Sequence, residues 1–266
     1  GTLAAAPLAN EKKVVYLTPV TGGTNVDAAG EYVFRVANSD LLAGRDIAQS
    51  AYSLGFRKAV VVTEVTEYTL DIKDTFEKTF KELGGAVLLS EEFQPETTDF
   101  RTIVAKAKTA NPDVIVTLSQ TGVGGAHFVK QAREVGILAP LFSDFTFVVN
   151  ENAKKIVGSF EGVYFADPAY DAESSEVQTF FERYKEVYGT PSMIPFHAAS
   201  TYDSVMMIVD ALRAVGNDSE KVHEWLLANV QNRTGLMGTF SLDANGNSEL
   251  GFVIKQVRGG QFVEVK

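Results

Sequence analysis

Four short apolar segments recur along the chain at a constant interval, and this recurrence constrains the fold more than any other feature. The segments AVVVTE, AVLLSE, DVIVTL and PLFSDF begin at Ala59, Ala86, Asp113 and Pro140, so each starts 27 residues after the one before. Short apolar, largely β-branched runs are typical of strands buried on both faces. Strands that alternate with helices predict an α/β fold with a parallel sheet flanked by helices.

The intervals between these segments carry helical periodicity. Ile72, Phe76, Phe80 and Leu83 recur at the spacing of one helix face, and two glycines follow directly and end the helix. Two further helices are expected, over residues 100–108 and 126–135. Because the segments share a period but not their side chains, they are not an internal sequence repeat.

The pattern changes after a fifth expected strand over 162–166, where Asp167-Pro168 predicts a break in helix and strand alike. Long helices are expected over 174–188, 198–214 and 219–229, and strands over 238–242, 252–257 and 262–265. In the helix over 198–214, the residues expected on the buried side are Val205, Ile208, Val209 and Leu212.

Composition excludes several kinds of site and partner. The 266 residues include 34 acidic and 24 basic ones, and the formal net charge of −10 disfavours a nucleic-acid backbone or an anionic lipid surface as partner. The absence of cysteine excludes disulfides, thiolate nucleophiles and cysteine-based zinc sites. No apolar run approaches the roughly 18 residues needed to span a bilayer, so the chain is expected to be soluble.

The first residues admit two interpretations. TLAAAPLA, residues 2–9, resembles the tail of a signal peptide but lacks a basic leader and a hydrophobic stretch of adequate length, so a short helix before a strand over 13–17 is favoured. The loop that follows contains Gly22 and Gly23. A strand-like run over 32–36 comes next instead of a helix, which argues against a phosphate-binding loop.

Two motifs that suggest ligand chemistry are better explained by turns. Asp243, Asn245 and Glu249 do not have the spacing of a calcium loop, so a hairpin turn is expected there. The glycines at 122, 124 and 125 do not fit the dinucleotide fingerprint; they predict a tight turn between strand and helix whose free N–H groups face a cleft.

The sequence offers no catalytic or metal-binding constellation. His127, His197 and His223 are dispersed without metal-ligand spacing, and no Gly-x-Ser-x-Gly motif exposes a nucleophile. We therefore expect no enzyme activity, no metal and no cofactor.

Polar residues follow each of three predicted strands at the point where the strand ends. They are Glu64 and Tyr68, then Ser119, Gln120 and Thr121, then Asp144 and Thr146. Ligands of open α/β sheets bind at the carboxyl ends of the strands. Each residue alone fits a solvated loop or a helix cap equally well, but together they predict a small-molecule site.

Seven segments resemble, in order, the Leu/Ile/Val-binding type of bacterial solute-binding protein, which has the type I periplasmic binding protein fold. The segments are GEYVFRV, EYTLDIKDTFEKTFKELGG, TTDFRTIVAKAKTANPDVIV, FVKQAREVGI, FEGVYF, STYDSVMMIVDALRAVG and GTFSLDANGN. No segment is decisive alone, whereas seven in the family's order are.

The resemblance implies two α/β lobes, joined by three crossovers, that clamp an amino acid or similar small carboxylate. Lobe one would comprise residues 1–40 and 167–250, and lobe two residues 41–166 and 251–266. The crossovers would fall at 37–42, 166–168 and 248–251. Family members begin with βα units that have no counterpart here, so lobe one is expected to be incomplete.

The resemblance also implies ligand-binding residues in both lobes. From lobe one, a loop would hold the ligand carboxylate; its candidates are Val20, Thr21, Gly23 and Thr24. From lobe two, Tyr68 would cover the ligand, Ser119, Gln120 and Thr121 would line the side-chain pocket, and Asp144 would bind the ammonium group. For Asp144 a cap on the helix near Asn150 is the open alternative, with Glu64 as reserve candidate. The family's Tyr-Gly pair reads Tyr68-Thr69 here.

The function implied is that of an extracytoplasmic receptor, periplasmic or extracellular, that delivers its ligand to the membrane permease of an ABC importer. Such a receptor is a monomer, with a lipid anchor as an option. The alternatives are a ligand-sensing domain of a receptor or regulator with the same fold and, in another class, an enzyme on a similar scaffold.

Overall fold

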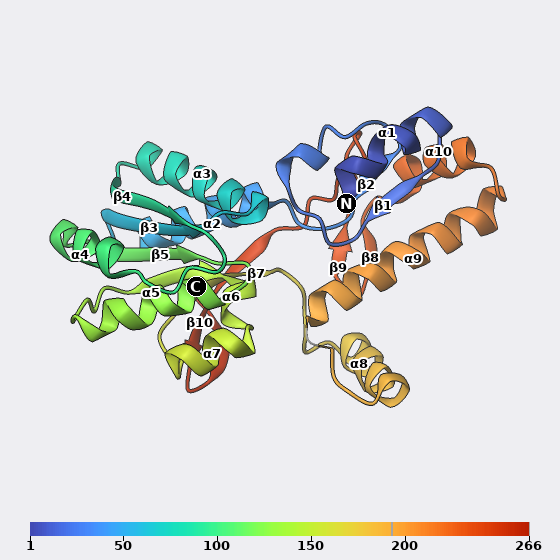
Figure 1. Ribbon diagram of the computed structural model, residues 1–266. Helices are drawn as coiled ribbons and strands as arrows, with labels where there is room; N and C mark the ends of the chain where they lie inside the picture. Colours follow the sequence, from blue (N-terminus) through green and yellow to red (C-terminus); the bar gives the residue numbers. More distant parts are fainter. Residues whose placement is uncertain (193, 266) are drawn as a thin grey trace. The chain divides into compact units, whose positions relative to one another are not determined.

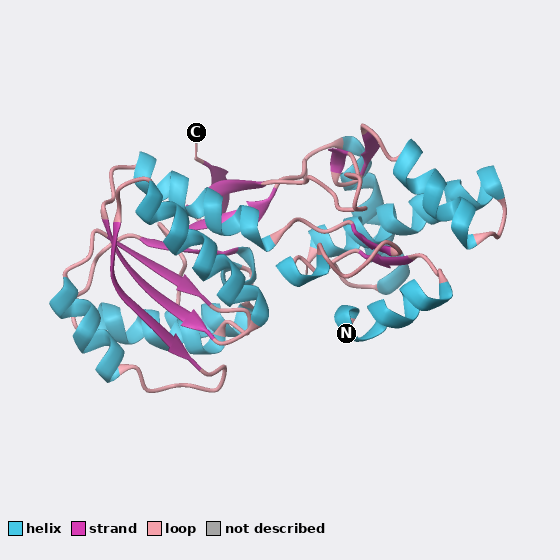
Figure 2. Cartoon of the chain, turned by 90° about the horizontal axis from the view of Figure 1, so that it is seen from above, coloured by secondary structure: helices cyan, strands magenta, loops and turns pink. Residues whose placement is uncertain are grey.

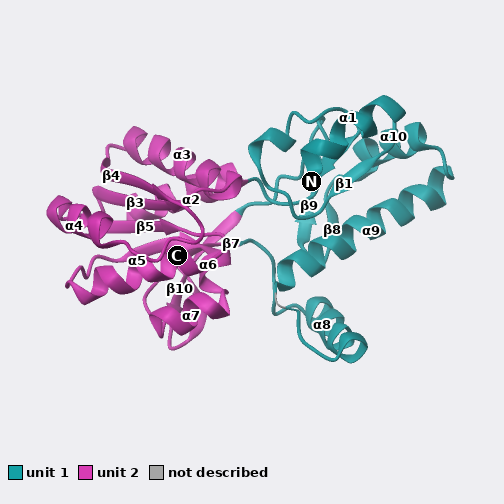
Figure 3. Cartoon of the chain, in the orientation of Figure 1, with its two compact units in different colours: residues 1–39, 168–251 teal, residues 40–167, 252–266 magenta. Residues whose placement is uncertain are grey.

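The computed structural model describes residues 1–192 and 194–265. The chain divides into two compact units (Figure 3). Unit 1 comprises residues 1–39 and 168–251, and unit 2 comprises residues 40–167 and 252–266. The chain therefore passes from one unit to the other three times, and each unit is described here by itself.

The four equally spaced segments form adjacent strands of one sheet in unit 2. They are β3 (Lys58–Glu64), β4 (Ala86–Phe93), β5 (Val114–Leu118) and β6 (Leu141–Asp144). These strands are parallel and lie in the order β4-β3-β5-β6. Figure 2 shows them side by side, with helices on both sides. The expectation that these segments open neighbouring strands of one sheet is confirmed.

The rest of the sheet differs from the expectation in two ways. The sheet continues with β7 (Tyr164–Pro168), which is parallel to β6, and then with β10 (Phe252–Arg258) and β11 (Gln261–Glu264), an antiparallel hairpin. The seven-stranded sheet is therefore mixed and not wholly parallel. β7 begins and ends two residues later than expected, so the strand includes Asp167, which forms an ion pair of 2.7 Å with Lys255, and it ends at Pro168, within the expected break.

Helices cover both faces of this sheet (Figure 1). One face carries α2 (Asp40–Ser53) and α3 (Glu67–Glu82); the other carries α4 (Arg101–Ala110), α5 (Val123–Glu134), α6 (Phe145–Val148) and α7 (Glu151–Val157). Ile72, Phe76 and Phe80 are buried against the sheet, as their spacing predicts. Leu83 lies outside that face, because it is the C-cap of α3 and its side chain is largely accessible.

The described residues of unit 1 form two small sheets and five helices, one of which is a short 3-10 helix. Its elements are α1 (Thr2–Lys12), β1 (Tyr16–Thr18), a 3-10 helix η1 (Thr24–Val26), β2 (Val33–Arg35), α8 (Ser175–Tyr188), α9 (Pro195–Val215), α10 (Ser219–Asn229), β8 (Arg233–Gly235) and β9 (Gly238–Phe240). β1 and β2 are parallel, and β8 and β9 are antiparallel. The expected helix near the start of the chain is confirmed by α1.

The buried side of α9 is only partly the one expected: Ile208 packs against the core of unit 1 and Val209 is half-buried, but the other two expected residues are exposed. Val205 is 55% exposed and Leu212 is 38% exposed. The buried positions instead recur every four residues from Ala199 to Ala211. Among them, Asp203 accepts hydrogen bonds from the backbone N–H groups of Leu236 (3.0 Å) and Met237 (2.8 Å). These bonds require Asp203 to face the interior, and this fixes the rotation of the helix.

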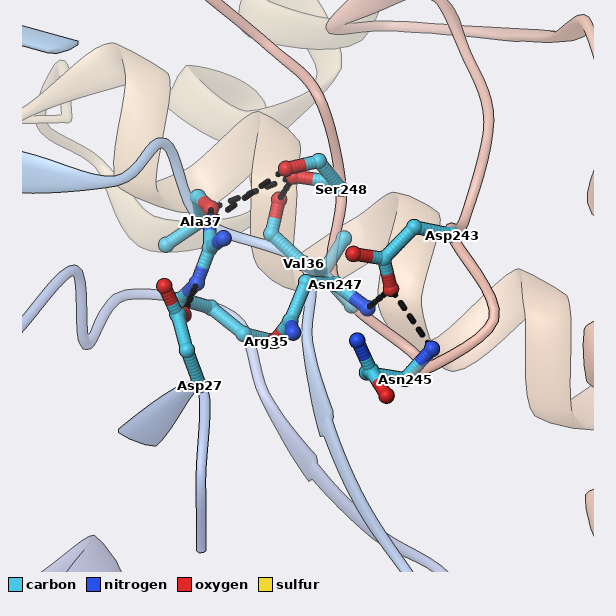
Figure 4. A network of polar contacts seen from close by, with 8 residues as sticks. All are labelled: Asp27, Arg35, Val36, Ala37, Asp243, Asn245, Asn247 and Ser248. Carbon is cyan, nitrogen blue, oxygen red and sulfur yellow. Dashed lines mark hydrogen bonds and ion pairs between the residues drawn. The ribbon is translucent and has the colours of Figure 1, made fainter. Parts of the chain in front are cut away.

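Arg35, the last residue of β2, forms a hydrogen bond with Ser248, which is distant in the sequence but lies in the same unit (Figure 4). Its Nε donates to Asp27 Oδ1 at 2.6 Å, and its guanidinium also donates to the carbonyl oxygens of Ala37 and Ser248. The Ser248 hydroxyl donates in turn to the carbonyl oxygens of Val36 (2.9 Å) and Ala37 (3.1 Å). The buried guanidinium is thus satisfied by a carboxylate and two backbone carbonyls.

The segment just before Ser248 is the turn expected from the sequence. Asp243 Oδ1 accepts hydrogen bonds from the backbone N–H groups of Asn245 (2.8 Å) and Asn247 (2.9 Å), as Figure 4 shows. Gly246 has φ 78°, a left-handed conformation that glycine adopts without strain. The Asp243 carboxylate closes a turn, and the hairpin interpretation is confirmed.

The core between α3 and the sheet gives a direct test of the fold. Phe76 is fully buried and stacks on Phe80 with ring centroids 5.2 Å apart. Phe76→Ala should lower the free energy of unfolding by about 3–5 kcal/mol, because it leaves a cavity between helix and sheet. Leu88→Ala, at a position 42% exposed on the edge strand β4, should change it by no more than about 0.5 kcal/mol. Urea unfolding measures both, and similar losses in the two variants would contradict the packing.

Candidate functional site

The carboxyl ends of three parallel strands bring Glu64, Ser119 and Asp144 together in unit 2. Glu64 ends β3, Ser119 follows β5, and Asp144 ends β6. Because β3, β5 and β6 are parallel neighbours, their ends lie at one edge of the sheet. Ser119 joins the two acids, since its hydroxyl donates to Glu64 Oε2 at 2.6 Å and its backbone N–H donates to Asp144 Oδ2 at 3.2 Å.

Glu64 is 0% exposed. Besides the Ser119 hydroxyl, its Oε2 accepts a hydrogen bond of 3.1 Å from the Thr121 backbone N–H. Burial of a carboxylate is costly unless hydrogen bonds or an opposite charge compensate it. Within the described part of the chain, no ion pair involves Glu64 or Asp144. These two acids are therefore held by hydrogen bonds alone.

Asp144 is 1% exposed, and both its carboxylate oxygens are engaged. Oδ1 accepts hydrogen bonds from the Phe147 backbone N–H (3.1 Å) and the Thr146 hydroxyl, and Oδ2 accepts the Ser119 N–H. Burial raises the pKa of Asp144, and these hydrogen bonds oppose the rise. Asp144 thus caps a helix, α6, but not the one near Asn150, because Asn150 itself caps α7.

Tyr68 lies in the first turn of α3, and its hydroxyl oxygen is buried beside Asp144 and Thr146. Burial, followed by the negative charges of Asp144 and Asp40, raises the pKa of Tyr68 well above its ordinary range. Asp40, buried in the first turn of α2, is therefore a member of this acidic edge that sequence reasoning missed. Asp40 lies within the crossover expected at 37–42, and this position is the sequence feature that could have identified it.

The glycine-rich turn after β5 does not leave its N–H groups free as expected. The N–H of Gly122 donates to the Ser119 carbonyl at 3.2 Å, and that of Gly125 donates to the Ser119 hydroxyl at 3.2 Å. Thr121 is held from both sides, because its N–H donates to Glu64 and its carbonyl accepts from Asn150 Nδ2 at 2.8 Å. The turn is braced internally, and the side chains of Gln120 and Thr121 remain exposed.

The four candidates from the resemblance in unit 1 lie in one loop directly after β1. Val20 is exposed, and the Thr21 hydroxyl is hydrogen-bonded to the Thr2 hydroxyl at 3.0 Å. Gly23 is buried and its carbonyl accepts the Val26 N–H at 3.0 Å, while Thr24 begins η1. The structure therefore places four candidates in unit 1 and five, Tyr68, Ser119, Gln120, Thr121 and Asp144, in unit 2.

A hollow in unit 1 is separate from all nine candidates. It has a volume of about 1060 Å³, lies between α8 and α9, and is lined by aromatic side chains that include Phe180, Tyr184 and Tyr202. Residues 1–192 and 194–265 contain no cluster of three His, Asp or Glu side chains that is suited to a metal ion. Across the same residues, no helix has the length and apolarity to cross a membrane.

The raised pKa of Asp144 predicts how stability depends on pH. Because the folded state binds this proton more tightly than the unfolded state, stability falls as pH rises from the ordinary value of 3.8 through the folded pKa. The side chain in Asp144→Asn cannot ionise. The free energy of unfolding of this variant minus that of the wild type should therefore be larger at pH 7 than at about pH 4.5.

Urea unfolding at the two pH values measures this difference. Asp99→Asn is the matched control, because hydrogen bonds with Arg101 lower the pKa of Asp99 to about 2. The contribution of Asp99 is present above its unfolded pKa and is lost only as pH falls toward 2, so it should stay nearly constant between the two measurements. If the wild type instead became more stable relative to Asp144→Asn as pH rises, this result would contradict the raised pKa of the buried Asp144 carboxyl.

The amino-acid sequence of the chain is similar to those of periplasmic binding proteins. A sequence profile described as "Periplasmic binding protein" matches residues 1–261. Leu/Ile/Val-binding protein homolog 6 of Brucella melitensis is 21% identical over 228 residues, which cover 82% of this chain and 57% of that protein. The chain thus spans little more than half the length of the curated relatives it matches.

Solved structures agree with this family. A leucine-binding protein from Thermotoga maritima is 29% identical with a TM-score of 0.85, and the match covers 100% of this chain and 76% of that one. A solute-binding protein of an ABC transporter from R. palustris, in complex with benzoate, is 22% identical with a TM-score of 0.82 and covers 99% of this chain and 73% of that one. The fold is that of type I periplasmic binding proteins, and the chain belongs to the periplasmic binding protein family.

Proposed function

We propose that this protein binds an amino acid and delivers it to the membrane permease of an ABC importer. The observation that carries the proposal is the buried pair Glu64 and Asp144, which lie at the carboxyl ends of parallel strands and have no basic partner among the described ion pairs. An ammonium group supplies the positive charge that this edge lacks. The names of two relatives, a leucine-binding protein and a Leu/Ile/Val-binding homologue, support the same ligand class.

The two units take different parts in this proposal. Asp144 binds the ammonium group, Tyr68 covers the ligand, and the turn from Ser119 to Thr121 lines its side chain. In unit 1, the loop with Val20, Thr21, Gly23 and Thr24 binds the carboxylate through N–H and hydroxyl groups. Gly23 permits a close approach of ligand and backbone, because it has no side chain.

The protein acts by binding and release, without turnover. The Ser119 hydroxyl donates to the Glu64 carboxylate, but both residues are fully buried and the hydroxyl oxygen also accepts the Gly125 N–H, so this pair is engaged in holding the turn and is not presented as a nucleophile with its base. In this role the protein works outside the cytoplasm, periplasmic or extracellular, as a monomer that meets the permease.

The ligand can be identified without assuming its structure. Full-length protein is purified without added amino acids and denatured, and the released small molecules are determined by mass spectrometry. Calorimetry with the twenty amino acids, benzoate and 4-hydroxybenzoate then measures affinity. The proposal requires saturable binding of at least one amino acid without product formation; binding of the aromatic acids alone, or a product from a bound amino acid, would overturn it.

Asp144→Ala tests the ammonium site. The variant should weaken binding of the amino acid by roughly 2 to 4 kcal/mol, which is about 30-fold to nearly 1,000-fold, because the ligand ammonium loses its charged partner. Asp218→Ala is the matched control, since Asp218 is also a carboxylate that caps a helix, α10, outside the proposed site. It should lower stability, because a helix cap is lost, and leave affinity unchanged. Equal affinities for the two variants would remove Asp144 from the site.

A further inference from the structure

We propose that Glu64 is a specificity-determining residue: its buried carboxylate, coupled to Asp144 through Ser119, makes the site select ligands that carry an ammonium group over ligands that carry only a carboxylate. The inference rests on the proposed function and extends it, because it assigns discrimination between two ligand classes to one residue. The relatives include both classes, since one binds leucine by its name and another was solved with benzoate.

The hydrogen bonds around Ser119 define the state of the Glu64 side chain. Ser119 Oγ accepts the Gly125 N–H at 3.2 Å, so its own hydrogen is donated to Glu64 Oε2 at 2.6 Å. The Thr121 N–H points at the same oxygen. The hydrogen bonds that reach this carboxyl within the described chain are all donated to it, which is the environment that suits a carboxylate.

Ser119 also connects Glu64 to Asp144. One end of the residue, its hydroxyl, is fixed by Glu64, and its backbone N–H donates to Asp144 Oδ2 at 3.2 Å. Ser119 therefore hydrogen-bonds to both acids. It follows β5, the strand that lies between β3, which ends in Glu64, and β6, which ends in Asp144. A displacement of Ser119 moves a hydrogen-bond donor of Asp144.

This arrangement concentrates negative charge where little water screens it. Both carboxylates are at most 1% exposed, and Asp40 adds a third buried acid near Tyr68. An arriving ammonium interacts favourably with all of them, whereas a ligand with only a carboxylate adds one more negative charge. The second carboxylate, Glu64, thus adds to discrimination without contacting the ligand.

Substitution by glutamine separates charge from position. In Glu64→Gln, the amide oxygen can occupy the place of Oε2 and still accept from Ser119 and Thr121, so the turn is retained while the charge is removed. Glu64→Ala removes both. Asp203→Asn is the matched control, because Asp203 is a buried carboxylate that accepts two backbone N–H groups in unit 1, outside the proposed site.

The experiment compares ligand pairs that differ only in the ammonium group. Leucine is paired with 4-methylpentanoate, and phenylalanine with 3-phenylpropanoate. Calorimetry on the full-length wild type and the three variants gives the ratio of the two dissociation constants in each pair. Thermal unfolding without ligand is recorded for every variant.

The expected result is a pair of changes in opposite directions. Glu64→Gln should reduce the preference for the amino acid over its deaminated analogue by about tenfold. It should also raise the melting temperature of the ligand-free protein, because one of two buried like charges is gone. Glu64→Ala should lower the melting temperature, and Asp203→Asn should leave the ligand ratio within about twofold.

Two outcomes overturn the inference while the proposed function stands. One is a Glu64→Gln variant that binds the amino acid with an unchanged ligand ratio. The other is a variant whose melting temperature and amino-acid affinity both fall while the ratio is constant, which is the behaviour of a residue that only braces the turn. If the wild type binds none of the amino acids, the proposed function itself fails.

Discussion

The parallel pairing of β3 with β5, and of β5 with β6, is the constraint from which the rest of unit 2 follows. Parallel strands end at the same edge, so three segments separated by tens of residues deliver their last side chains to one place. Glu64 and Asp144 are buried at that edge although each is an acid, and donors from the turn after β5 and from α6 hold their carboxylates. The sheet thus creates both the convergence of polar groups and the low-dielectric surroundings in which their charges matter.

The elements whose sequence signals are local were predictable. The constant interval located β3 to β6, and the spacing of Ile72, Phe76 and Phe80 located the buried face of α3, because both patterns report burial directly. The rotation of α9 was not predictable in this way. Val205 and Leu212 are apolar but exposed, whereas Asp203 is buried and accepts hydrogen bonds from Leu236 and Met237, which lie far along the chain. Apolar periodicity cannot report a rotation set by a polar contact.

The candidate site was likewise predictable from the sequence only in part. Sequence located the strand ends, and therefore Ser119 and Asp144, because carboxyl ends of parallel strands are where polar residues gather. It did not reveal that Ser119 bridges two acids, or that the N–H groups of the glycine-rich turn are used within the turn. Those features depend on which donor lies within hydrogen-bonding distance of which acceptor, and a register difference of one residue changes every such pair.

The hydrogen bonds between Ser248 and the backbone at Val36 and Ala37 have a consequence for the order in which the chain folds. They join residues on opposite sides of the whole of segment 40–167, so in an unfolded chain they close a very long loop at a high entropic cost. Once β3 to β7 have assembled, that segment is compact and the loop is effectively short. During synthesis these strands emerge before Ser248 does. The hydrogen bonds that Ser248 makes with the backbone at Val36 and Ala37 are therefore expected to form only after the strands of segment 40–167 have assembled.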